Sequence, residues 1–421
     1  MSAPIAPKIA IACGGTGGHL FPGLAVAEQL VRRGASVTLL ISPKDVDQQA
    51  AKKISGMEIV TLPAVGLSSG QKIAFLRGFL QSYRAAKKHF QKNPPHAALA
   101  MGGFTSAPPL LAAKPFGARI FLHESNTIPG RANRWLSRVV HQAFVGFPQA
   151  AARLHTRNVT TTGTPARPEF QARDSAACRV ALGLDPACPV LLVVGGSQGA
   201  TGINNLIVHS LPLSWERRRP AGGRLADEPA GRQRSQDLQF LHFTGSADTE
   251  RVRRAYAEKN LRAVVHPFFS EMELALGAAT VAVSRAGASS LAELAAMRVP
   301  SVLIPFPAAT DNHQFFNARA FAETGAAQLL EQKNATPDLL VSLVSELIAN
   351  AAAREKMQTA LATWHAPKAA EEIAEIILRT VAAEERRSPT RPGSAREAKR
   401  AGSETGAPSD GARMICQTTV A

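Results

Sequence analysis

The sequence predicts an α/β protein made of two doubly wound parallel-sheet domains, and three observations carry this prediction. Short apolar runs of strand length alternate with segments of helical periodicity. The succession of strand, glycine-rich loop and helix occurs near residue 8 and again near residue 189. The 421 residues are enough for two domains of ordinary size, each with its own core. We therefore expect an N-terminal domain over residues 1–165 and a C-terminal domain over residues 166–383.

The first half begins with a buried strand and a helix. KIAIACGG, from Lys8, is a continuous apolar run that ends in glycines, and a helix is predicted from about Pro22 to Arg33, where Gly34 ends it. Further runs of strand character are VTLLIS, HAALAMGG, ARIFLHES, QAFVGF and VTTTG. Apolar strands separated by helical segments are typical of a parallel sheet that is covered on both faces.

The second half repeats this plan after the periodicity lapses over residues 164–187. The succession of strand, glycine loop and helix restarts at PVLLVVGGSQGA. Further strand candidates are LQFLHFTG, ATVAVSRAG and VPSVLIPF. Residues 215–236 combine proline, glycine and six arginines without periodicity, which predicts a disordered insertion. Residues 384–421 are similarly poor in apolar side chains, so we expect a disordered basic tail.

Composition excludes several classes of protein. No stretch approaches the roughly 20 apolar residues that cross a bilayer, and the N-terminus lacks the basic start of a signal peptide. The four cysteines, at 13, 178, 188 and 416, have neither zinc-site spacing nor the density of a disulfide framework. We expect an unexported protein of the reducing cytoplasm that uses no metal.

The net charge of +16 lies almost entirely in the first domain. Residues 1–165 hold 19 Lys and Arg against 5 Asp and Glu, whereas the remainder holds 29 against 27. A cationic domain suits an anionic membrane surface or a pyrophosphate-bearing substrate as well as a nucleic acid. Charge alone therefore does not choose among these partners.

Residues 72–90 predict a basic amphipathic helix. Its apolar face carries Ile73, Leu76, Leu80 and Tyr83 with Phe79 nearby, and its edge carries Arg77, Arg84 and Lys88. A helix that faces a core gives the same apolar stripe, so the pattern by itself leaves membrane contact and core packing open.

Two glycine-rich loops are candidate ligand sites. In the first, Gly14, Gly15, Thr16, Gly17 and Gly18 precede His19, an imidazole placed to act as a general base at the carboxyl edge of the sheet. The second, residues 195–200, offers the Ser197 hydroxyl to a phosphate. Neither loop has the P-loop lysine or the spacing of a dinucleotide fingerprint, which disfavours nucleoside-triphosphate hydrolysis and dinucleotide binding.

A third segment, residues 284–318, places a loop, a helix and a further strand and loop in succession. On the helix, Glu293 could accept two ribose hydroxyls, and Ser289 and Ser290 at its start could meet phosphate oxygens. Taken alone, Glu293 is equally explained as a solvated helix carboxylate.

Together these segments resemble the MurG family, which converts lipid I to lipid II in peptidoglycan synthesis. The motifs occur in the family's order over roughly residues 8–330: GGTGGHLFPGLAVAEQL, MGGFTSAPPLLAA, HESNTIPGRANRWLS, GTPAR, GGSQGA, and SRAGASSLAEL through DNHQFFNA. The resemblance implies a GT-B fold, in which two Rossmann-like domains face each other across a cleft. The N-terminal domain would take the acceptor and the C-terminal domain the donor.

By motif position the resemblance also implies which residues bind UDP-N-acetylglucosamine. Phe269 would lie beside uracil, Glu293 would bind the ribose, and Gln314 would reach the sugar hydroxyls. The other implied donor contacts are Thr16, Gly17, Gly18 and Asn126 from the N-terminal domain and Arg167 and Ser197 near the diphosphate, to which the residue pattern adds Ser289. The family usually has Asn where this chain has Thr164 in GTPAR. Both residue types form hydrogen bonds, so we expect only a local change beside Arg167.

Inverting sugar transfer requires a base for the acceptor hydroxyl and stabilisation of the departing diphosphate. His19 is the first candidate for the base and Glu124 the second. Arg167, Ser197 and helix N-termini could stabilise the diphosphate without a metal or other cofactor. Asp45, Val46 and Asp47 spell the metal-binding DxD pattern, but they follow a strand at a helix start, where capping carboxylates are common.

The resemblance favours lipid I and an anionic membrane surface as partners, at the cytoplasmic face of the inner membrane, and no nucleic acid. The family's membrane patch lies in the region of residues 72–90. Cell-wall synthesis and division proteins are further candidate partners. The alternatives are a GT-B transferase with another lipid or small-molecule acceptor, a UDP-GlcNAc 2-epimerase, and a non-catalytic scaffold that binds membranes or nucleic acid.

Overall fold

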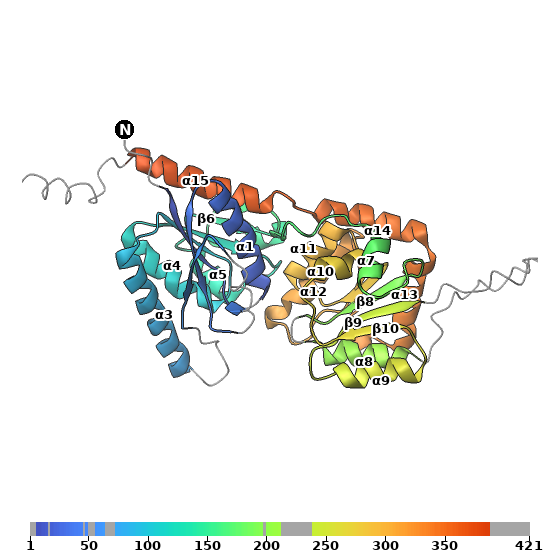
Figure 1. Cartoon of the computed structure of the whole chain (residues 1–421). Coiled ribbons are helices and arrows are strands. Elements are labelled where there is room, and N and C mark those ends of the chain that lie inside the picture. The colour runs from blue at the N-terminus through green and yellow to red at the C-terminus, as the bar shows by residue number, and fades with distance from the viewer. Residues whose placement is uncertain are drawn as a thin grey trace, which may run out of the picture.

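The chain forms two α/β domains that lie side by side (Figure 1). The computed structural model describes residues 6–15, 17–44, 47–48, 55–63, 72–196, 199–211 and 238–387. The predicted insertion 215–236 and most of the predicted tail therefore lie outside the described residues. Each domain has its own sheet and its own buried apolar core. The prediction of two doubly wound parallel-sheet domains is confirmed.

The N-terminal sheet has, among the described residues, seven parallel strands in the order β3-β2-β1-β4-β5-β6-β7. Their buried positions are apolar on both faces of the sheet, as expected of a sheet that helices cover on both sides. The order of the strands changes direction between β1 and β4. Folds of this kind bind ligands at the carboxyl ends of the strands beside such a point. The strands are β1 (Lys8–Ala12), β2 (Ser36–Ile41), β3 (Glu58–Thr61), β4 (Ala97–Ala100), β5 (Arg119–Glu124), β6 (Gln142–Val145) and β7 (Val159–Thr161).

The helices of this domain cover both faces of the sheet (Figure 1). Helix α1 begins at Gly17, five residues before the predicted start at Pro22, and Pro22 lies inside it. The prediction was wrong because it treated the proline as a start residue, the position it most often occupies. The helices are α1 (Gly17–Arg32), α3 (Lys72–Lys92), α4 (Ala107–Ala113), α5 (Arg131–Leu136) and α6 (Pro148–Ala151).

The C-terminal sheet repeats the same arrangement, with the order β10-β9-β8-β11-β12-β13 among the described residues. Every strand pair in it is parallel, and the reversal falls between β8 and β11. The strands are β8 (Val190–Val194), β9 (Gln239–Phe243), β10 (Ala263–His266), β11 (Val281–Ser284), β12 (Ser301–Leu303) and β13 (Gln328–Leu329).

Side-chain caps begin several helices of the C-terminal domain. Asp174, Thr336 and Asn350 each accept a hydrogen bond from a backbone amide in the first turn of the helix that follows. The helices are α7 (Ser175–Ala181), α8 (Thr201–Ser210), α9 (Thr249–Glu258), α10 (Met272–Ala278), α11 (Ala288–Met297), α12 (His313–Glu323), α13 (Pro337–Ala349) and α14 (Ala351–Trp364).

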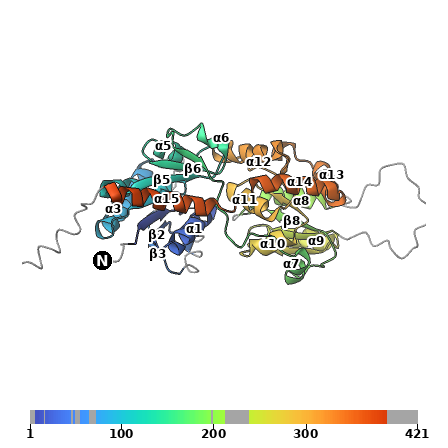
Figure 2. The ribbon, with the colours of Figure 1, turned by 90° about the horizontal axis from the view of Figure 1, so that it is seen from above.

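The last helix, α15 (Ala369–Arg387), returns to the N-terminal domain and lies along it, as Figure 2 shows from above. Ile373 and Ile377 are fully buried in the N-terminal core, and Arg33 forms an ion pair with Glu371 at 2.7 Å. The predicted boundary, which assigned these residues to the C-terminal domain, is corrected accordingly. The helix also continues to Arg387, so residues 384–387 do not belong to an unstructured tail.

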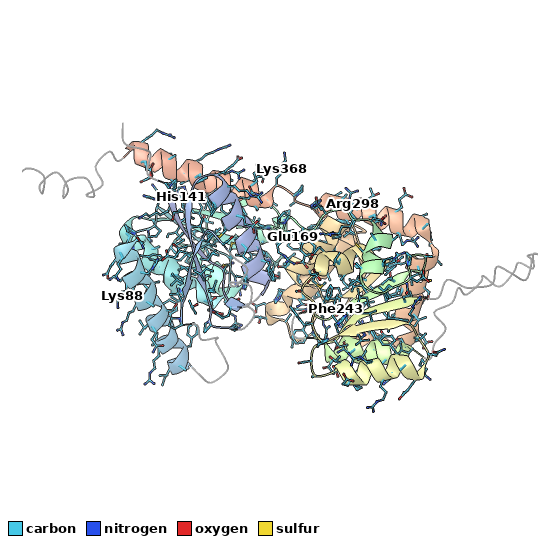
Figure 3. All side chains as sticks on the ribbon, in the orientation of Figure 1. Lys88, His141, Glu169, Phe243, Arg298 and Lys368 are labelled. Carbon is cyan, nitrogen blue, oxygen red and sulfur yellow. The ribbon has the colours of Figure 1, made fainter. Side chains whose placement is uncertain are left out.

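The chain passes between the two domains twice, and the two connecting segments are in contact. Lys368 marks the second crossing, between the two lobes in Figure 3. A Cβ atom added to Gly163, on the first crossing, would lie 2.3 Å from the Cβ of Ala366 on the second, so this position requires glycine. Beside the crossings, Phe147 at the end of β6 packs against Phe321 and Trp364 of the C-terminal domain, with ring centroids 6.1 and 5.3 Å away.

Candidate active site

The first glycine loop is held by hydrogen bonds from three directions. The Gly15 amide donates to Asp47 Oδ2 at 2.7 Å, Lys44 Nζ donates to the Gly15 carbonyl at 2.8 Å, and Thr105 Oγ1 donates to the Gly14 carbonyl at 2.7 Å. Asp47 Oδ2 also accepts from the amide and hydroxyl of Ser42. The last residue of the DxD pattern therefore holds the glycine loop, and its hydrogen-bond donors among the described residues are Gly15 and Ser42 and not the first amides of a helix. Asp45, Val46 and Thr16 lie outside the described residues.

His19 packs on a turn of two glycines that follows β4. A Cβ atom on Gly102 would lie 2.8 Å from His19 Nε2, and Gly102 and Gly103 both have positive φ, so only glycine allows this approach. Burial lowers the pKa of His19 to about 4, a shift that nearby Asp47 opposes and His313 and Lys44 reinforce. The imidazole is therefore neutral at pH 7 and able to accept a proton.

Glu124, the second candidate base, is buried and fully engaged. Its Oε1 accepts from the amide and the side chain of Asn126, and its Oε2 accepts from Gly130 N and Asn133 Nδ2, all at 2.9–3.1 Å. Burial raises the pKa of Glu124, and these hydrogen bonds oppose the shift. The carboxylate thus holds the loop 124–130 in shape.

Asn317 joins this loop to the C-terminal domain. Its Oδ1 accepts from the amide and hydroxyl of Thr127, both at 2.9 Å, and its Nδ2 donates to Asn126 Oδ1 at 3.0 Å. An ion pair between Arg134 and Asp311, at 2.7 Å, lies nearby on the surface. The HESNTIPGRANRWLS and DNHQFFNA motifs, far apart in sequence, are therefore in direct contact.

The N-termini of α1 and α11 also meet at the junction. Ser289 Oγ donates to the Gly18 carbonyl at 3.1 Å. That carbonyl lacks its usual helical donor because the residue four positions later is Pro22, which has no N–H. The sequence interpretation expected Ser289 at a phosphate, whereas its hydroxyl hydrogen is used here on the opposite domain. The contact brings Gly17 and Gly18 to the start of the helix that carries Glu293.

Arg167 lies between aromatic rings and near Glu293. Its guanidinium carbon is 4.6 Å from the ring centroid of Phe21 on α1 and 4.8 Å from that of Phe170, and its buried Nε has no hydrogen-bond partner among the residues that the structure describes. Burial raises the pKa of Glu293 to about 7, although Arg167 lowers it. A cation and a carboxylate thus face the junction from the C-terminal side.

Gln314, on α12, contacts the loops that follow β11 and β12, and Phe269 follows β10 on the other side of the sheet's strand reversal. Gln314 Oε1 accepts from the amides of Ala286 and Phe306, at 3.2 and 3.0 Å, and so ties the loop after β11 to the loop after β12. Phe269 stacks on Phe243 at 5.2 Å, on the side of the C-terminal domain toward its partner domain (Figure 3). Phe269 is thus packed, whereas its neighbour Phe268 is 57% exposed.

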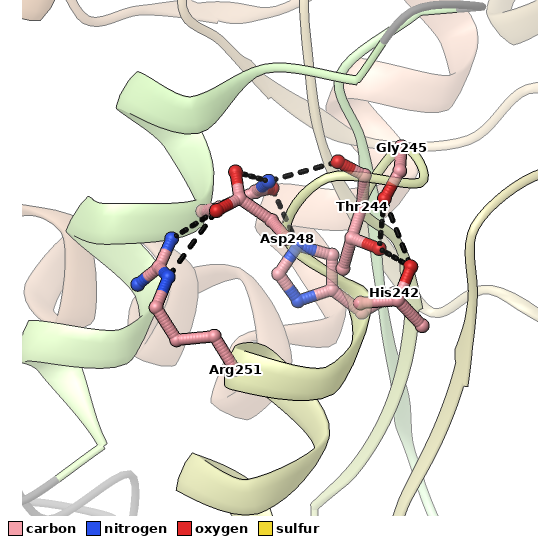
Figure 4. A network of polar contacts seen from close by, with 7 residues as sticks. His242, Thr244, Gly245, Asp248 and Arg251 are labelled. Atoms are coloured by element: carbon pink, nitrogen blue, oxygen red, sulfur yellow. Dashed lines mark hydrogen bonds and ion pairs between the residues drawn. The ribbon is translucent and has the colours of Figure 1, made fainter.

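A buried polar network supports the second glycine loop (Figure 4). His242 Nε2 contacts Asn204 Oδ1 at 3.0 Å, and Asn204 Nδ2 donates to the Thr244 carbonyl and to Asp248 Oδ2. Burial lowers the pKa of His242 to about 3, so the ring is neutral. Gly199 packs directly on this network, because a Cβ there would lie 2.2 Å from the Thr244 carbonyl. Ser197 itself lies outside the described residues.

Helix α3 presents an apolar strip on the surface of the N-terminal domain. Ile73, Leu76 and Leu80 are 71%, 57% and 42% exposed, whereas Phe79 and Tyr83 pack toward the core. The side chains of Arg77, Arg84 and Lys88 are also exposed. Within the described residues, no helix is both long and apolar enough to span a bilayer. The predicted basic amphipathic helix is therefore present, with its apolar strip uncovered.

Sequence reasoning missed three residues of this region. Asn317 lay inside the quoted DNHQFFNA motif, but nothing local indicates that it bonds to the other domain. The sequence analysis named Phe269 and not Phe268, because alternation alone does not say which of two adjacent phenylalanines is exposed. Asn204 follows the second glycine loop, and only the tertiary structure places it beneath that loop. Within the described residues, histidines, cysteines and carboxylates form no cluster of three or more with metal-binding geometry.

Comparison with known proteins extends over most of the chain. The glycosyltransferase family 28 N-terminal domain matches residues 9–145, and the family 28 C-terminal domain matches residues 190–373. The UDP-N-acetylglucosamine--N-acetylmuramyl-(pentapeptide) pyrophosphoryl-undecaprenol N-acetylglucosamine transferase of Anaeromyxobacter sp. (strain K) is 34% identical over 386 residues, covering 89% of this chain and 93% of that one. The protein of the same name from Xanthomonas oryzae pv. oryzae (strain MAFF 311018) is 35% identical, covering 92% and 82%.

Solved structures agree. The crystal structure of MurG from Acinetobacter baumannii has a TM-score of 0.65 and 25% identity, and covers 89% of this chain and 99% of that one. A glycosyltransferase from Rickettsia africae ESF-5 has a TM-score of 0.58 at 12% identity, covering 89% and 99%, a likeness of fold alone. With both domains matched by family 28 and more than 30% identity to proteins of one name, the chain belongs to the MurG family of glycosyltransferases and has their GT-B fold.

Proposed function

We propose that the chain transfers N-acetylglucosamine from UDP-GlcNAc to the 4-hydroxyl of MurNAc in lipid I, undecaprenyl-pyrophosphoryl-MurNAc-pentapeptide, and so forms lipid II. One observation carries the proposal beyond family membership. The Ser289–Gly18 contact brings together the N-termini of α1, which carries the neutral His19, and of α11, which carries the Glu293 carboxylate. Helix N-termini attract anions, so this junction suits a diphosphate whose sugar faces the histidine.

The C-terminal domain would hold the donor. Glu293 accepts the two ribose hydroxyls, which requires its ionised form, and the aromatic pair Phe268 and Phe269 lies beside the uracil. Arg167, whose Nε has no partner in the described part of the chain, pairs with the diphosphate together with Ser197 and the first amides of α11. From the N-terminal side, Thr16, Gly17 and Gly18 line the phosphates.

Asn126 and Gln314 would hold the sugar. The Oε1 of Gln314 is engaged with backbone amides, so its Nε2 is the end that donates to a sugar hydroxyl. Asn126 likewise uses its Oδ1 on Asn317 and keeps a hydrogen of its Nδ2 for the ligand.

His19 is the base that we favour for the reaction. In an inverting transfer the acceptor oxygen attacks the anomeric carbon opposite the diphosphate, its proton passes to the imidazole, and the bond to UDP breaks. Developing charge on the diphosphate is stabilised by Arg167 and the α11 amides. Glu124 fits a positioning role better, because its two oxygens already accept four hydrogen bonds.

The acceptor's lipid implies contact with the cytoplasmic face of the inner membrane. The exposed apolar strip of α3 would insert among lipid headgroups, and the cations along its edge would attract anionic lipids. Each Lys or Arg near such a surface contributes about 1 kcal/mol, and salt screens it. The cationic excess of the N-terminal domain supports the same orientation.

Release of UDP from UDP-GlcNAc, measured with and without a lipid I analogue, tests the proposal. We expect UDP to appear only with the analogue and in equal amounts to the disaccharide product. Diacylglycerol and small-molecule acceptors serve as comparison arms. Turnover with these and none with lipid I would refute the assigned acceptor, and UDP released together with free sugar in the absence of any acceptor would indicate an epimerase.

A further inference from the structure

We propose that Asn317 on α12 is the positioning residue that sets Asn126 for the donor sugar, by fastening the loop 124–130 of one domain to the loop 284–287 of the other. The inference rests on the proposed function, in which Asn126 donates to a GlcNAc hydroxyl. Asn317 itself has no exposed surface, so it acts through Asn126 and not on the substrate.

The Asn317 side chain uses its full hydrogen-bonding capacity at this place. Its Oδ1 accepts twice from Thr127, through the amide and the hydroxyl, both at 2.9 Å. Its Nδ2 donates to Asn126 Oδ1 at 3.0 Å and to the Ala286 carbonyl at 3.2 Å. An amide offers two acceptor sites and two donor hydrogens, and all four are engaged. Three of the four bonds reach the opposite domain.

This arrangement fixes the orientation of the Asn126 amide. Asn317 bonds to its Oδ1, and Glu124 Oε1 accepts from its Nδ2 at 3.1 Å, so both ends of the amide are held. The bonds to Asn317 and Glu124 together fix the direction in which the second Nδ2 hydrogen of Asn126 points. These bonds of Asn317, which we call the Asn317 clamp, are also linked to Gln314. The Ala286 carbonyl accepts from Asn317, and the Ala286 amide donates to Gln314 Oε1.

The domains have other contacts along α12 that do not depend on Asn317. Asp311, just before the helix, pairs with Arg134, and Phe321, near its end, packs on Phe147. Asn317 lies between these two contacts. Its removal should therefore leave the domains attached while Asn126 loses the neighbour that orients it.

Steady-state kinetics of Asn317→Ala test the proposal. We expect kcat/KM for UDP-GlcNAc to fall about 10- to 100-fold, the scale of a misplaced substrate-positioning group. Affinity for UDP, which lacks the sugar, should stay within twofold of the wild type. Asn317→Asp should be no better at neutral pH, because a carboxylate would face the Asn126 and Ala286 oxygens. Asn350→Ala, which removes an asparagine that caps α14 within one domain, is the matched control and should keep wild-type kinetics.

A double-mutant cycle with Asn126→Ala separates positioning from general support. If Asn317 acts through Asn126, its removal adds little to the loss already caused by Asn126→Ala. Additive losses, or UDP affinity that falls in parallel with turnover, would overturn the proposal. Wild-type kinetics for Asn126→Ala would instead refute the donor role of Asn126, and the clamp with it. Asn317→Ser provides the same comparison if Asn317→Ala yields too little folded protein.

Discussion

The two domains share one strand order, yet burial acts in opposite directions on their principal titratable groups. On the N-terminal side burial lowers the pKa of His19 to about 4 and removes its charge at pH 7. On the C-terminal side burial raises the pKa of Glu293 to about 7, and Arg167 nearby favours the ionised form. Both shifts have the same physical cause, which is the cost of removing a charged group from water.

The difference assigns separate tasks to the two halves of the junction. The neutral imidazole is the form that can take a proton from a hydroxyl, and a carboxylate that ionises near neutral pH suits hydroxyls that donate to it. The low pKa of His19 also makes it a weak base, so the protonated imidazole needs stabilisation during the reaction, which Asp47 favours. The cationic surface lies in the domain with the histidine, where a lipid-linked pyrophosphate would approach. A shared fold thus supports two chemistries through the residues at its strand ends.

The largest expected effect is on the chemical step, through the histidine. We expect His19→Ala to lower kcat by roughly 10²- to 10⁴-fold, the usual range for a lost general base. The KM for UDP-GlcNAc should change little, because His19 is not among the residues proposed to bind the donor. Initial rates with a lipid I analogue provide the measurement, and His155→Ala, an exposed histidine of the same domain, is the control. A kcat within threefold of wild type would remove His19 from the mechanism.

The second effect is on donor binding, through the carboxylate. Glu293→Ala should raise the KM for UDP-GlcNAc by at least about 100-fold, since two charge-assisted hydrogen bonds of about 1.5–3 kcal/mol each are lost. Glu355→Ala removes an exposed carboxylate from α14 of the same domain and should have no effect. If Glu293→Ala lowered kcat and left KM unchanged, the proposed division between the domains would be wrong.

A smaller effect is the pH dependence of the affinity for UDP-GlcNAc, which follows from the raised pKa of Glu293. Because ribose binding needs the ionised carboxylate, donor binding releases the Glu293 proton at low pH, and affinity for UDP-GlcNAc should rise as pH increases through about 7. One pH unit below that pKa the loss approaches about tenfold. Titration calorimetry from pH 5.5 to 8.5 measures it. The Glu293→Gln variant should lose this dependence, and an unchanged pH profile in that variant would assign it to another group.

The smallest effect is at the membrane surface. Replacement of Ile73 and Leu76 by serine should weaken sedimentation with vesicles of anionic lipid several-fold, because about 25 cal/mol is lost for each Å² of apolar area no longer buried. Added salt should weaken binding of the wild type as well. Val180→Ser, on an exposed position of the C-terminal domain, is the matched control. Equal sedimentation of all variants would place the contact elsewhere.

The sequence predicted the local features and missed the long-range ones, for identifiable reasons. Strand runs and glycine loops follow from periodicity and from backbone needs within a few residues, so the plan of two parallel sheets was predicted correctly. The short strands β3, β10 and β13 were missed. The strip of Ile73, Leu76 and Leu80 followed from helical spacing in the same way.

Contacts between distant segments leave no such local pattern. The return of α15 to the first domain, the bond from Ser289 to Gly18 and the Asn317 clamp each join residues that only the folded chain brings together. The pKa of His19 likewise depends on burial against Gly102 and Gly103, which the sequence does not reveal.

Equilibrium binding of UDP-GlcNAc to three forms of the intact protein tests the division of tasks most directly. At pH 8, calorimetry should give His19→Ala the same dissociation constant as the wild type within twofold, and Glu293→Ala one at least tenfold weaker. Equal weakening in both variants, or full affinity in both, would contradict the assignment of the donor to the C-terminal domain.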